Sequence, residues 1–220
     1  MKSVFWPLLL ATVGCGGPPR AAQDPPDCPA PDARPPLTRV TGAAPGVRED
    51  VRYATDDNFT DAPLPGYEEA AALLRPAAAD ALARVAARLE ARGLGLLVWD
   101  AYRPVRATLA MVEWAERTGN EWVLDEGYVA RRSNHNRGNT VDLTVISLHS
   151  GEPLDMGTAY DHFGPESHTA NASGTVLENR RSLLDAMEAE GWENYVQEWW
   201  HFTYPSDDDF LDVPIGCYVG

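Results

Sequence analysis

"RPAAADALARVAARLEARGLGLLVWDAYRPVRA", residues 75–107, is the stretch that decides the fold, because a helix and a strand can both be predicted within it. Pro76 suits the first turn of a helix, where its missing amide hydrogen costs nothing. Gly93 suits the residue that closes a helix. The apolar side chains that recur at helical spacing between them are Leu82, Val85, Ala86 and Leu89. We therefore expect an amphipathic helix that begins at Pro76 and is closed by Gly93.

Residues 94–100, "LGLLVWD", follow this helix and predict a buried strand, since the run is short and almost wholly apolar. Pro104 cannot continue a strand, and it restricts Arg103 before it to an extended geometry. A second helix is expected from about residue 105 to residue 117, with its end near Gly119.

Farther along the chain, apolar and polar residues alternate from 141 to 145, which is the period of a strand with one face in the core. We also expect helices at about 121–130 and 178–190, and a last strand in "YVQEWWHFTY", residues 195–204. Strands separated by helices in this irregular order predict an α+β fold.

Length, composition and charge limit what the protein can be. With 220 residues, 44% of them hydrophobic, the chain can bury a sizeable core in one domain. Its 33 acidic and 18 basic residues give a net charge of -15, which repels phosphate backbones and anionic headgroups. We therefore expect no nucleic-acid partner. Oligomeric state cannot be inferred from the sequence.

The first residues, "MKSVFWPLLLATVGCGG", have the layout of a secretory signal: a lysine, a short apolar run and small residues. Gly14-Cys15 resembles the lipobox of bacterial lipoproteins, although Thr12 stands where such boxes usually carry leucine. We expect an exported protein of the periplasm or cell envelope, lipid-anchored through Cys15 or else cleaved and released. A signal at 1–15, a proline-rich linker at 16–37 and one domain at 38–220 are predicted.

Three cysteines are an odd number for an exported protein. If Cys15 carries a lipid, Cys28 and Cys217 remain, one near each end of the mature chain. A disulfide between these two is expected, and two unpaired thiols are the alternative.

Candidate metal ligands stand in two separate motifs. His135 and Asp142 belong to "SNHNRGNTVDLT", residues 133–144, and Glu198 and His201 to "EWWHF". Two histidines and one carboxylate are the ligands of a catalytic zinc that keeps a fourth position for water. In a regular strand, residues three apart point to opposite faces. A bulge, bend or strand end must therefore bring Glu198 and His201 to the same site.

Glu198 is the candidate general base, since a carboxylate beside a zinc-bound water can take its proton and return it to the leaving amine. Arg103 could hold fixed positive charge against a developing oxyanion. Each residue also has a structural interpretation: His135 as a surface side chain, Asp142 as a strand-edge cap and Arg103 in a salt bridge.

These motifs together resemble the zinc D-alanyl-D-alanine dipeptidases of the vancomycin-resistance type. "SNHNRGNTVDLT" is similar to their SxHxxGxAxD motif, with Thr140 in place of the alanine. "WDAYRP" resembles their arginine-bearing turn, "EWWH" their ExWH signature, and residues 53–60 and 155–168 resemble further family segments. The similarity covers about residues 40–205. It implies a single α+β domain of the hedgehog/DD-peptidase-like fold, with a small, mainly antiparallel sheet flanked by helices.

The resemblance also implies roles for eight residues. One zinc ion per chain would be held by His135, Asp142 and His201, with Glu198 as general base and Arg103 as transition-state stabiliser. Ser133, Tyr53 and Asp161 would surround a small D,D-dipeptide substrate, with Asp161 at its free amino terminus.

The expected activity is zinc-dependent hydrolysis of D-alanyl-D-alanine, in cell-wall metabolism or glycopeptide resistance. A related D,D-carboxypeptidase or an L-alanyl-D-glutamate endopeptidase with a wider cleft is the first alternative. A zinc-binding module without catalysis is the second, although it would not need both Glu198 and Arg103.

Overall fold

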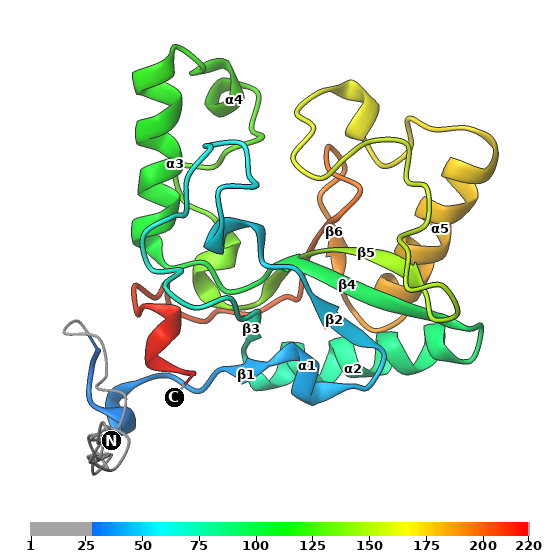
Figure 1. The fold of residues 1–220 in the computed structure, drawn as a ribbon, viewed down its shortest axis with the longest axis horizontal. Coiled ribbons are helices and arrows are strands. Elements are labelled where there is room, and N and C mark those ends of the chain that lie inside the picture. The colour runs from blue at the N-terminus through cyan, green and yellow to red at the C-terminus, as the bar shows by residue number, and fades with distance from the viewer. Residues whose placement is uncertain (1–27, 220) are drawn as a thin grey trace, which may run out of the picture.

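A five-stranded sheet forms the centre of the computed structural model, which describes residues 28–219 (Figure 1). Its strands, in spatial order, are β2 (Val47–Glu49), β4 (Leu94–Asp100), β5 (Thr140–Ser147), β7 (His201–Thr203) and β6 (Glu193–Asn194). The β2–β4 pair is parallel and the other three pairs are antiparallel. The predicted α+β fold with a small, mainly antiparallel sheet is confirmed.

Helices and short turns surround this sheet. The α-helices are α1 (Val40–Ala43), α2 (Pro76–Glu90), α3 (Val105–Thr118), α4 (Trp122–Asp125) and α5 (Gly174–Glu188). A second sheet pairs β1 (Thr38–Arg39) with β3 (Leu73–Leu74). The 3-10 turns are η1 (Pro31–Ala33), η2 (Arg52–Ala54), η3 (Asn134–Arg137), η4 (Pro165–Ser167) and η5 (Ile215–Cys217).

The segment from α2 to α3 forms as its local sequence predicts. Helix α2 begins at Pro76, and Gly93 follows it with φ of +73°. The side chains predicted to share the apolar face are all buried: Leu82, Val85, Ala86 and Leu89. Burial of each leucine or valine contributes about 1.5–3 kcal/mol. Strand β4 has the predicted bounds, and α3 ends at Thr118, where Gly119 caps it in the left-handed conformation.

Three predictions made from local pattern need correction. Helix α4 has only four residues, and α5 begins at Gly174, four residues before its expected start. The strand expected at 195–204 is wrong for most of its length, because only His201–Thr203 pair with β5. Residues 195–200 form a turn in which the Glu198 amide donates to the Tyr195 carbonyl at 2.9 Å.

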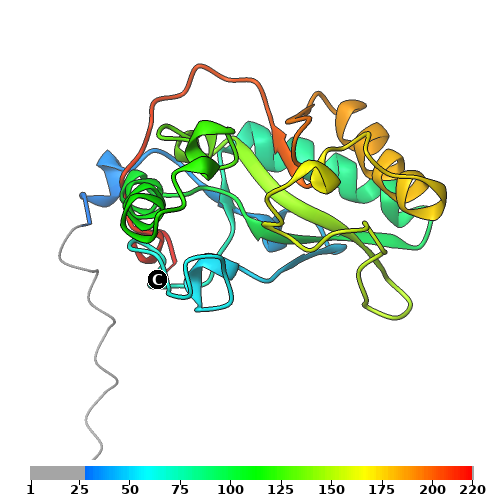
Figure 2. The same cartoon turned by 90° about the horizontal axis from the view of Figure 1, so that it is seen from above.

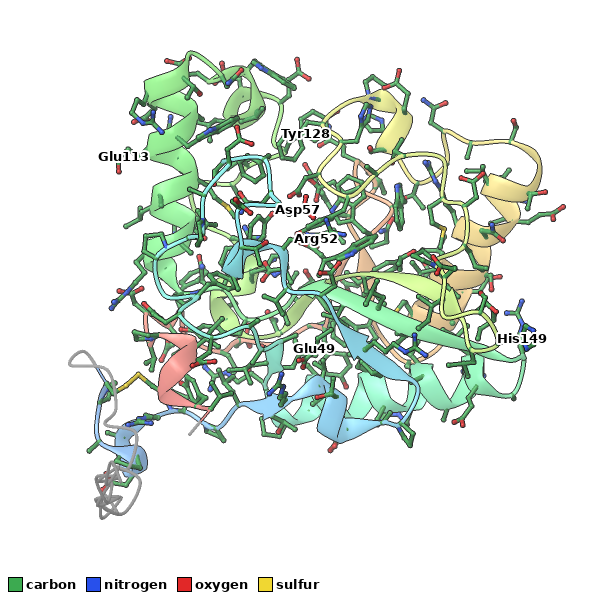
Figure 3. The ribbon with its side chains drawn as sticks, in the orientation of Figure 1. Glu49, Arg52, Asp57, Glu113, Tyr128 and His149 are labelled. Atoms are coloured by element: carbon green, nitrogen blue, oxygen red, sulfur yellow. A yellow bond between two sulfur atoms is a disulfide. The ribbon has the colours of Figure 1, made fainter. Side chains whose placement is uncertain are left out.

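The two ends of the described chain are joined. Cys28 and Cys217 form the expected disulfide, drawn as a yellow bond in Figure 3, and the Arg34 guanidinium donates to the Cys217 carbonyl. The described part of the predicted linker is thus held to the domain. The predicted signal and Cys15 lie outside the described residues. Within residues 28–219, no helix is long and apolar enough to cross a membrane.

The two faces of the central sheet have different covers, as Figure 2 shows. Helices α2 and α5 pack on one face, against β4 and β5. Long loops, including residues 50–72 and 148–173, cover the other face. The candidate site lies on this loop-covered side, because its cavity is lined by residues of these loops.

Candidate metal centre and active site

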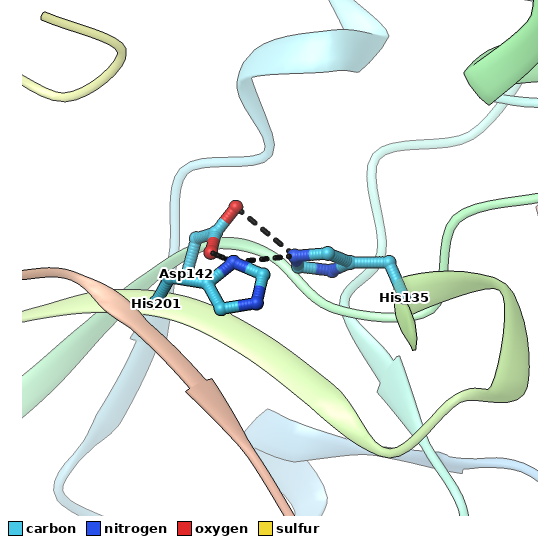
Figure 4. Close-up of side chains that lie close together, drawn as sticks. All are labelled: His135, Asp142 and His201. Carbon is cyan, nitrogen blue, oxygen red and sulfur yellow. Dashed lines mark hydrogen bonds and ion pairs between the residues drawn. The ribbon is translucent and has the colours of Figure 1, made fainter. Parts of the chain in front are cut away.

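Two imidazoles and one carboxylate converge at the end of the β4–β5–β7 region (Figure 4). His135 comes from η3, Asp142 from β5 and His201 from the first position of β7, where it pairs with Asp142 across the strands. Ligand atoms of the three residues lie within 4.8 Å of one another. Such a set of two histidines and one carboxylate is suited to a zinc-like dication.

The η3 turn positions His135 through its own backbone. Ser133 caps the turn, and its hydroxyl accepts a hydrogen bond from the His135 amide at 3.3 Å. Gly138 ends the turn with φ of +76°, a conformation that glycine adopts without strain. The buried Asn136 side chain donates to the Arg103 carbonyl at 2.8 Å and so ties η3 to the "AYRP" segment.

The turn at 195–200 explains how residues three apart reach one site. The His201 amide donates to the Glu198 carbonyl at 3.2 Å, and the Tyr195 amide donates to the His201 carbonyl at 3.0 Å. Glu198 Oε2 consequently lies 3.5 Å from His201 Nδ1. The bend predicted from the three-residue spacing of Glu198 and His201 is therefore present.

The atoms of the cluster are arranged to surround a cation. His135 Nδ1 lies 2.6 Å from the Ala101 carbonyl, which can only accept, so this nitrogen carries the proton. His135 Nε2 therefore presents a lone pair 3.3 Å from Asp142 Oδ2. Asp142 Oδ1 lies 3.0 Å from His201 Nδ1 but without hydrogen-bond geometry, so it is a buried oxygen without a hydrogen-bond partner. A metal ion at the centre would satisfy these acceptors.

The protonation preferences of the cluster follow from burial and from the charges of neighbouring side chains. Burial acts to raise the pKa of Asp142, but His135 and His201 outweigh it and lower that pKa well below its usual range. Burial lowers the pKa of His201, which favours the neutral imidazole that binds metals. Burial, with the charges of Asp142 and Asp161, raises the pKa of Glu198.

Arg103 is a buried cation at the same site, with 8% of its surface exposed. Its Nε and Nη2 donate to Asp100 Oδ2 at 3.0 and 2.8 Å. Burial acts to lower its pKa, but Asp100 and neighbouring tyrosines raise it above the usual value, so the charge is permanent. Its Nη1 donates to Met111 Sδ, a weak acceptor, at 3.3 Å. Arg103 thus forms a salt bridge and still offers positive charge to the cavity.

Tyr53 and Asp161 lie together on the loop side of the site. The Tyr53 hydroxyl donates to the Asp161 carboxylate, 3.0 Å from Oδ2. Burial, reinforced by the charge of Asp142, raises the pKa of Asp161 to about 8. A partly buried carboxylate with a tyrosine as its hydrogen-bond donor is stabilised by any ammonium group that binds next to it.

All eight predicted residues line one cavity of about 230 Å³. They are Tyr53, Arg103, Ser133, His135, Asp142, Asp161, Glu198 and His201. Aromatic side chains complete its wall, among them Phe59, Tyr128, Phe163, Tyr195 and Trp200. The cavity is polar around the metal-ligand cluster and aromatic elsewhere.

Two residues of the site were missed by the sequence analysis. Asp100, fully buried at the end of β4, holds Arg103 and lies 3.3 Å from His135 Nδ1. Tyr160 donates its hydroxyl to Asp142 Oδ2 at 2.9 Å. An acid that ends an otherwise apolar strand was the available signal for Asp100. Nothing local distinguishes Tyr160 from other tyrosines of the chain.

The other three histidines lie outside the cluster. His149 and His162 are exposed, and Figure 3 shows His149 at one end of the sheet, away from Tyr128. His168 Nε2 lies 3.2 Å from the Tyr128 hydroxyl.

Comparison with known proteins is consistent with this geometry. A family model described as D-ala-D-ala dipeptidase matches residues 35–218. A D-alanyl-D-alanine dipeptidase of Streptomyces coelicolor is 39% identical over 188 residues, covering 77% of this chain and 93% of that protein. One of Enterococcus faecium is 36% identical with the same coverage. A solved LD-carboxypeptidase structure, LdcB, is 19% identical with a TM-score of 0.42, covering 67% of this chain and 63% of that one.

Proposed function

The chain belongs to the D-alanyl-D-alanine dipeptidase family of peptidases, and from this premise we propose that it hydrolyses D-alanyl-D-alanine to two molecules of D-alanine. One zinc ion per chain is proposed as the cofactor. The observation that carries the proposal is the convergence of His135, Asp142 and His201 within 4.8 Å, with the Glu198 carboxylate beside them.

His135 Nε2, the Asp142 carboxylate and His201 Nδ1 would hold the ion, which would supply Lewis-acid chemistry: a lower pKa for water and a polarised substrate carbonyl. Glu198 accepts the proton of the attacking water and delivers it to the nitrogen of the leaving D-alanine. The Arg103 guanidinium stabilises negative charge that develops on the carbonyl oxygen. Asp100 keeps that guanidinium oriented through its two hydrogen bonds.

The dimensions of the site support a dipeptide rather than a longer chain. A cavity of about 230 Å³ is small for a peptide ligand. Asp161, supported by the Tyr53 hydroxyl, is proposed to pair with the substrate ammonium, while Ser133 lines the same cavity. A peptide extended on the amino side would leave the partly buried Asp161 without that cation, which is unfavourable.

Metal analysis of the purified protein, with an amine-release assay, tests the proposal. We expect one zinc per chain, hydrolysis of D-Ala-D-Ala, and no hydrolysis of L-Ala-L-Ala or of a longer peptide that ends in D-Ala-D-Ala. Cleavage of the longer peptide in preference to the dipeptide would favour a carboxypeptidase. Stoichiometric zinc with no turnover of any D,D-peptide would instead indicate a binding module.

We also propose that the protein is exported to the cell envelope. The signal-like pattern and Cys15 support this, and the Cys28–Cys217 disulfide is of the kind that persists in oxidising compartments. Membrane anchoring is tested by fractionating cells that express the wild type or Cys15→Ala. Loss of the membrane-bound fraction in the variant is expected, and equal release of both proteins would exclude the lipid anchor.

A further inference from the structure

The cavity around the metal-ligand cluster has two arginines in its wall, and the proposed hydrolysis uses only one of them. Among the lining residues that the structure describes, Arg103 and Arg132 alone carry a permanent positive charge. Arg103 is buried and donates two hydrogen bonds to Asp100. Arg132 is an exposed residue of the same wall, and the proposed mechanism gives it no role.

The guanidinium of Arg132 is placed by an aromatic ring. Its Cζ lies 4.6 Å from the centroid of the Phe210 ring, a distance at which a guanidinium stacks on an aromatic face. Within residues 28–219, the Arg132 side chain has no hydrogen bond or ion pair besides this contact. Its N–H donors are therefore available to a ligand.

Phe210 is itself held against the η3 turn of the metal centre. The Leu211 amide donates to the Asn136 carbonyl at 2.8 Å, which ties the chain next to Phe210 to this turn. The Arg137 Cζ lies 4.3 Å from the same ring centroid. The ring is thus connected to η3 in two ways, and it can orient Arg132 relative to the metal ligands.

The substrate of the proposed reaction has a carboxylate that needs a cation beside it. The cavity already contains the carboxylates of Asp142, Asp161 and Glu198, and they repel a further carboxylate unless a positive charge lies close to it. Asp161 is assigned to the substrate ammonium, and Arg103 to the carbonyl oxygen. Arg132 is the remaining cation, and a planar guanidinium can bind a carboxylate through two parallel hydrogen bonds.

We propose that Arg132 binds the free carboxylate of the dipeptide, and that Phe210 positions its guanidinium for this contact. The inference rests on the proposed function for the identity of the substrate. With Asp161 at the ammonium and Arg132 at the carboxylate, the site recognises both charged ends of a dipeptide. Amidation of the substrate carboxylate removes the second contact and leaves the first.

Kinetics of the zinc-loaded enzyme on D-Ala-D-Ala and on its carboxyl amide, D-alanyl-D-alaninamide, test this inference. Arg132→Ala should lower kcat/KM on the dipeptide by about tenfold to a hundredfold, the scale of a lost hydrogen bond to a charged group. The loss should lie in KM, because the contact is made in the ground state and in the transition state alike. On the amide the loss should be much smaller. Arg132→Lys keeps the charge without the planar pair of donors, so its kcat/KM on the dipeptide should lie between those of wild type and Arg132→Ala.

Two substitutions of Phe210 test the positioning role. Phe210→Leu removes the ring but keeps an apolar side chain, and Phe210→Tyr keeps the ring. We expect Phe210→Leu to raise KM for the dipeptide by about twofold to fivefold, the factor that corresponds to an exposed cation–π contact, and Phe210→Tyr to keep the wild-type KM. The KM for the amide should be the same in the two variants, whereas a merely structural role of the ring would change KM for both substrates.

Arg131→Ala is the matched control. Arg131 is also exposed, but its Nη1 pairs with Glu116 Oε1 at 2.8 Å and it does not line the cavity. This variant should keep wild-type kinetics on both substrates. An equal loss on the dipeptide and the amide in Arg132→Ala, or unchanged kinetics on both, would overturn the inference.

Calorimetry separates the inference from the proposed function, because it needs no turnover. If the protein does not hydrolyse the dipeptide but binds it, and Arg132→Ala weakens that binding while Arg131→Ala does not, only the proposed function is wrong. Hydrolysis of the dipeptide with a KM that Arg132→Ala leaves unchanged would count against the inference alone. Zinc-loaded protein that neither binds nor hydrolyses the dipeptide would overturn both.

Discussion

Strand β5 has two buried faces that differ in chemistry. On the face toward α2 and α5, alternate residues are apolar and fully buried: Val141, Leu143 and Val145. On the opposite face the alternate residues are polar and equally buried: Thr140, Asp142 and Thr144. The apolar face is satisfied by packing, whereas on the polar face Asp142 Oδ1 and Thr144 Oγ1 have no hydrogen-bond partner.

The difference teaches which face stabilises the fold and which serves the site. Each apolar side chain contributes about 1.5–3 kcal/mol by leaving water. Burying an unpaired polar atom is unfavourable by about 1–3 kcal/mol, so the polar face is retained in spite of that penalty. A metal ion held by Asp142 would remove the penalty at that carboxylate. Four substitutions test this division of roles.

The largest effect is expected for Asp142→Ala. The substitution removes the carboxylate that lies between the imidazoles of His135 and His201, so two ligands remain where a catalytic zinc needs three. Metal content after dialysis should fall close to zero, and hydrolysis should fall below detection. Elemental analysis and the amine-release assay measure both. Retention of a full equivalent of zinc would show that Asp142 is not a ligand.

Glu198→Ala should leave the metal bound but lower kcat by about 10²–10⁴, because the water loses its proton acceptor. Zinc content and steady-state kinetics separate the two effects. The control is Glu193→Ala, which truncates an exposed glutamate of β6 and should change neither quantity. If Glu198→Ala lost zinc to the same extent as activity, Glu198 would be a ligand and its role as base would be wrong.

Leu143→Ala probes the apolar face, and it should lower stability rather than zinc binding or activity. The cavity that it leaves in the core should lower the free energy of unfolding by about 2–5 kcal/mol. Zinc content and kcat per folded molecule should remain near wild type, since Leu143 points away from the cluster. Urea denaturation and kinetics at low temperature measure these quantities. A tenfold drop in kcat for folded protein would mean that the two faces are not independent.

The smallest of the four effects is expected for Tyr160→Phe. It removes the hydroxyl that donates to Asp142 Oδ2, and loss of such a partner weakens metal affinity or activity by about tenfold. Competition with a chelator reports the affinity. Tyr218→Phe is the matched control, because the Tyr218 hydroxyl is buried without a hydrogen-bond partner. Equal metal affinity and activity in wild type and Tyr160→Phe would show that this hydrogen bond does not support the cluster.

Local pattern predicted the elements whose stability is local. The α2 helix and β4 follow from apolar spacing and from Pro76, Gly93 and Pro104, which act on their immediate neighbours. The prediction failed at residues 195–204, where aromatic residues suggested a strand. There the backbone hydrogen bonds of Tyr195, Glu198 and His201 close a turn instead, and β7 is left with three residues.

The sequence by itself determined which residue types are available for the chemistry, since the motifs that contain them can be recognised from local sequence. These residues are His135, Asp142, Glu198, His201 and Arg103. Only the tertiary structure decided how they face one another. The pairing of β5 with β7 brings Asp142 beside His201, 59 positions later in the chain, and Asp100 joins Arg103 to His135. These contacts depend on long-range strand register and side-chain direction, which no local pattern of hydrophobicity encodes.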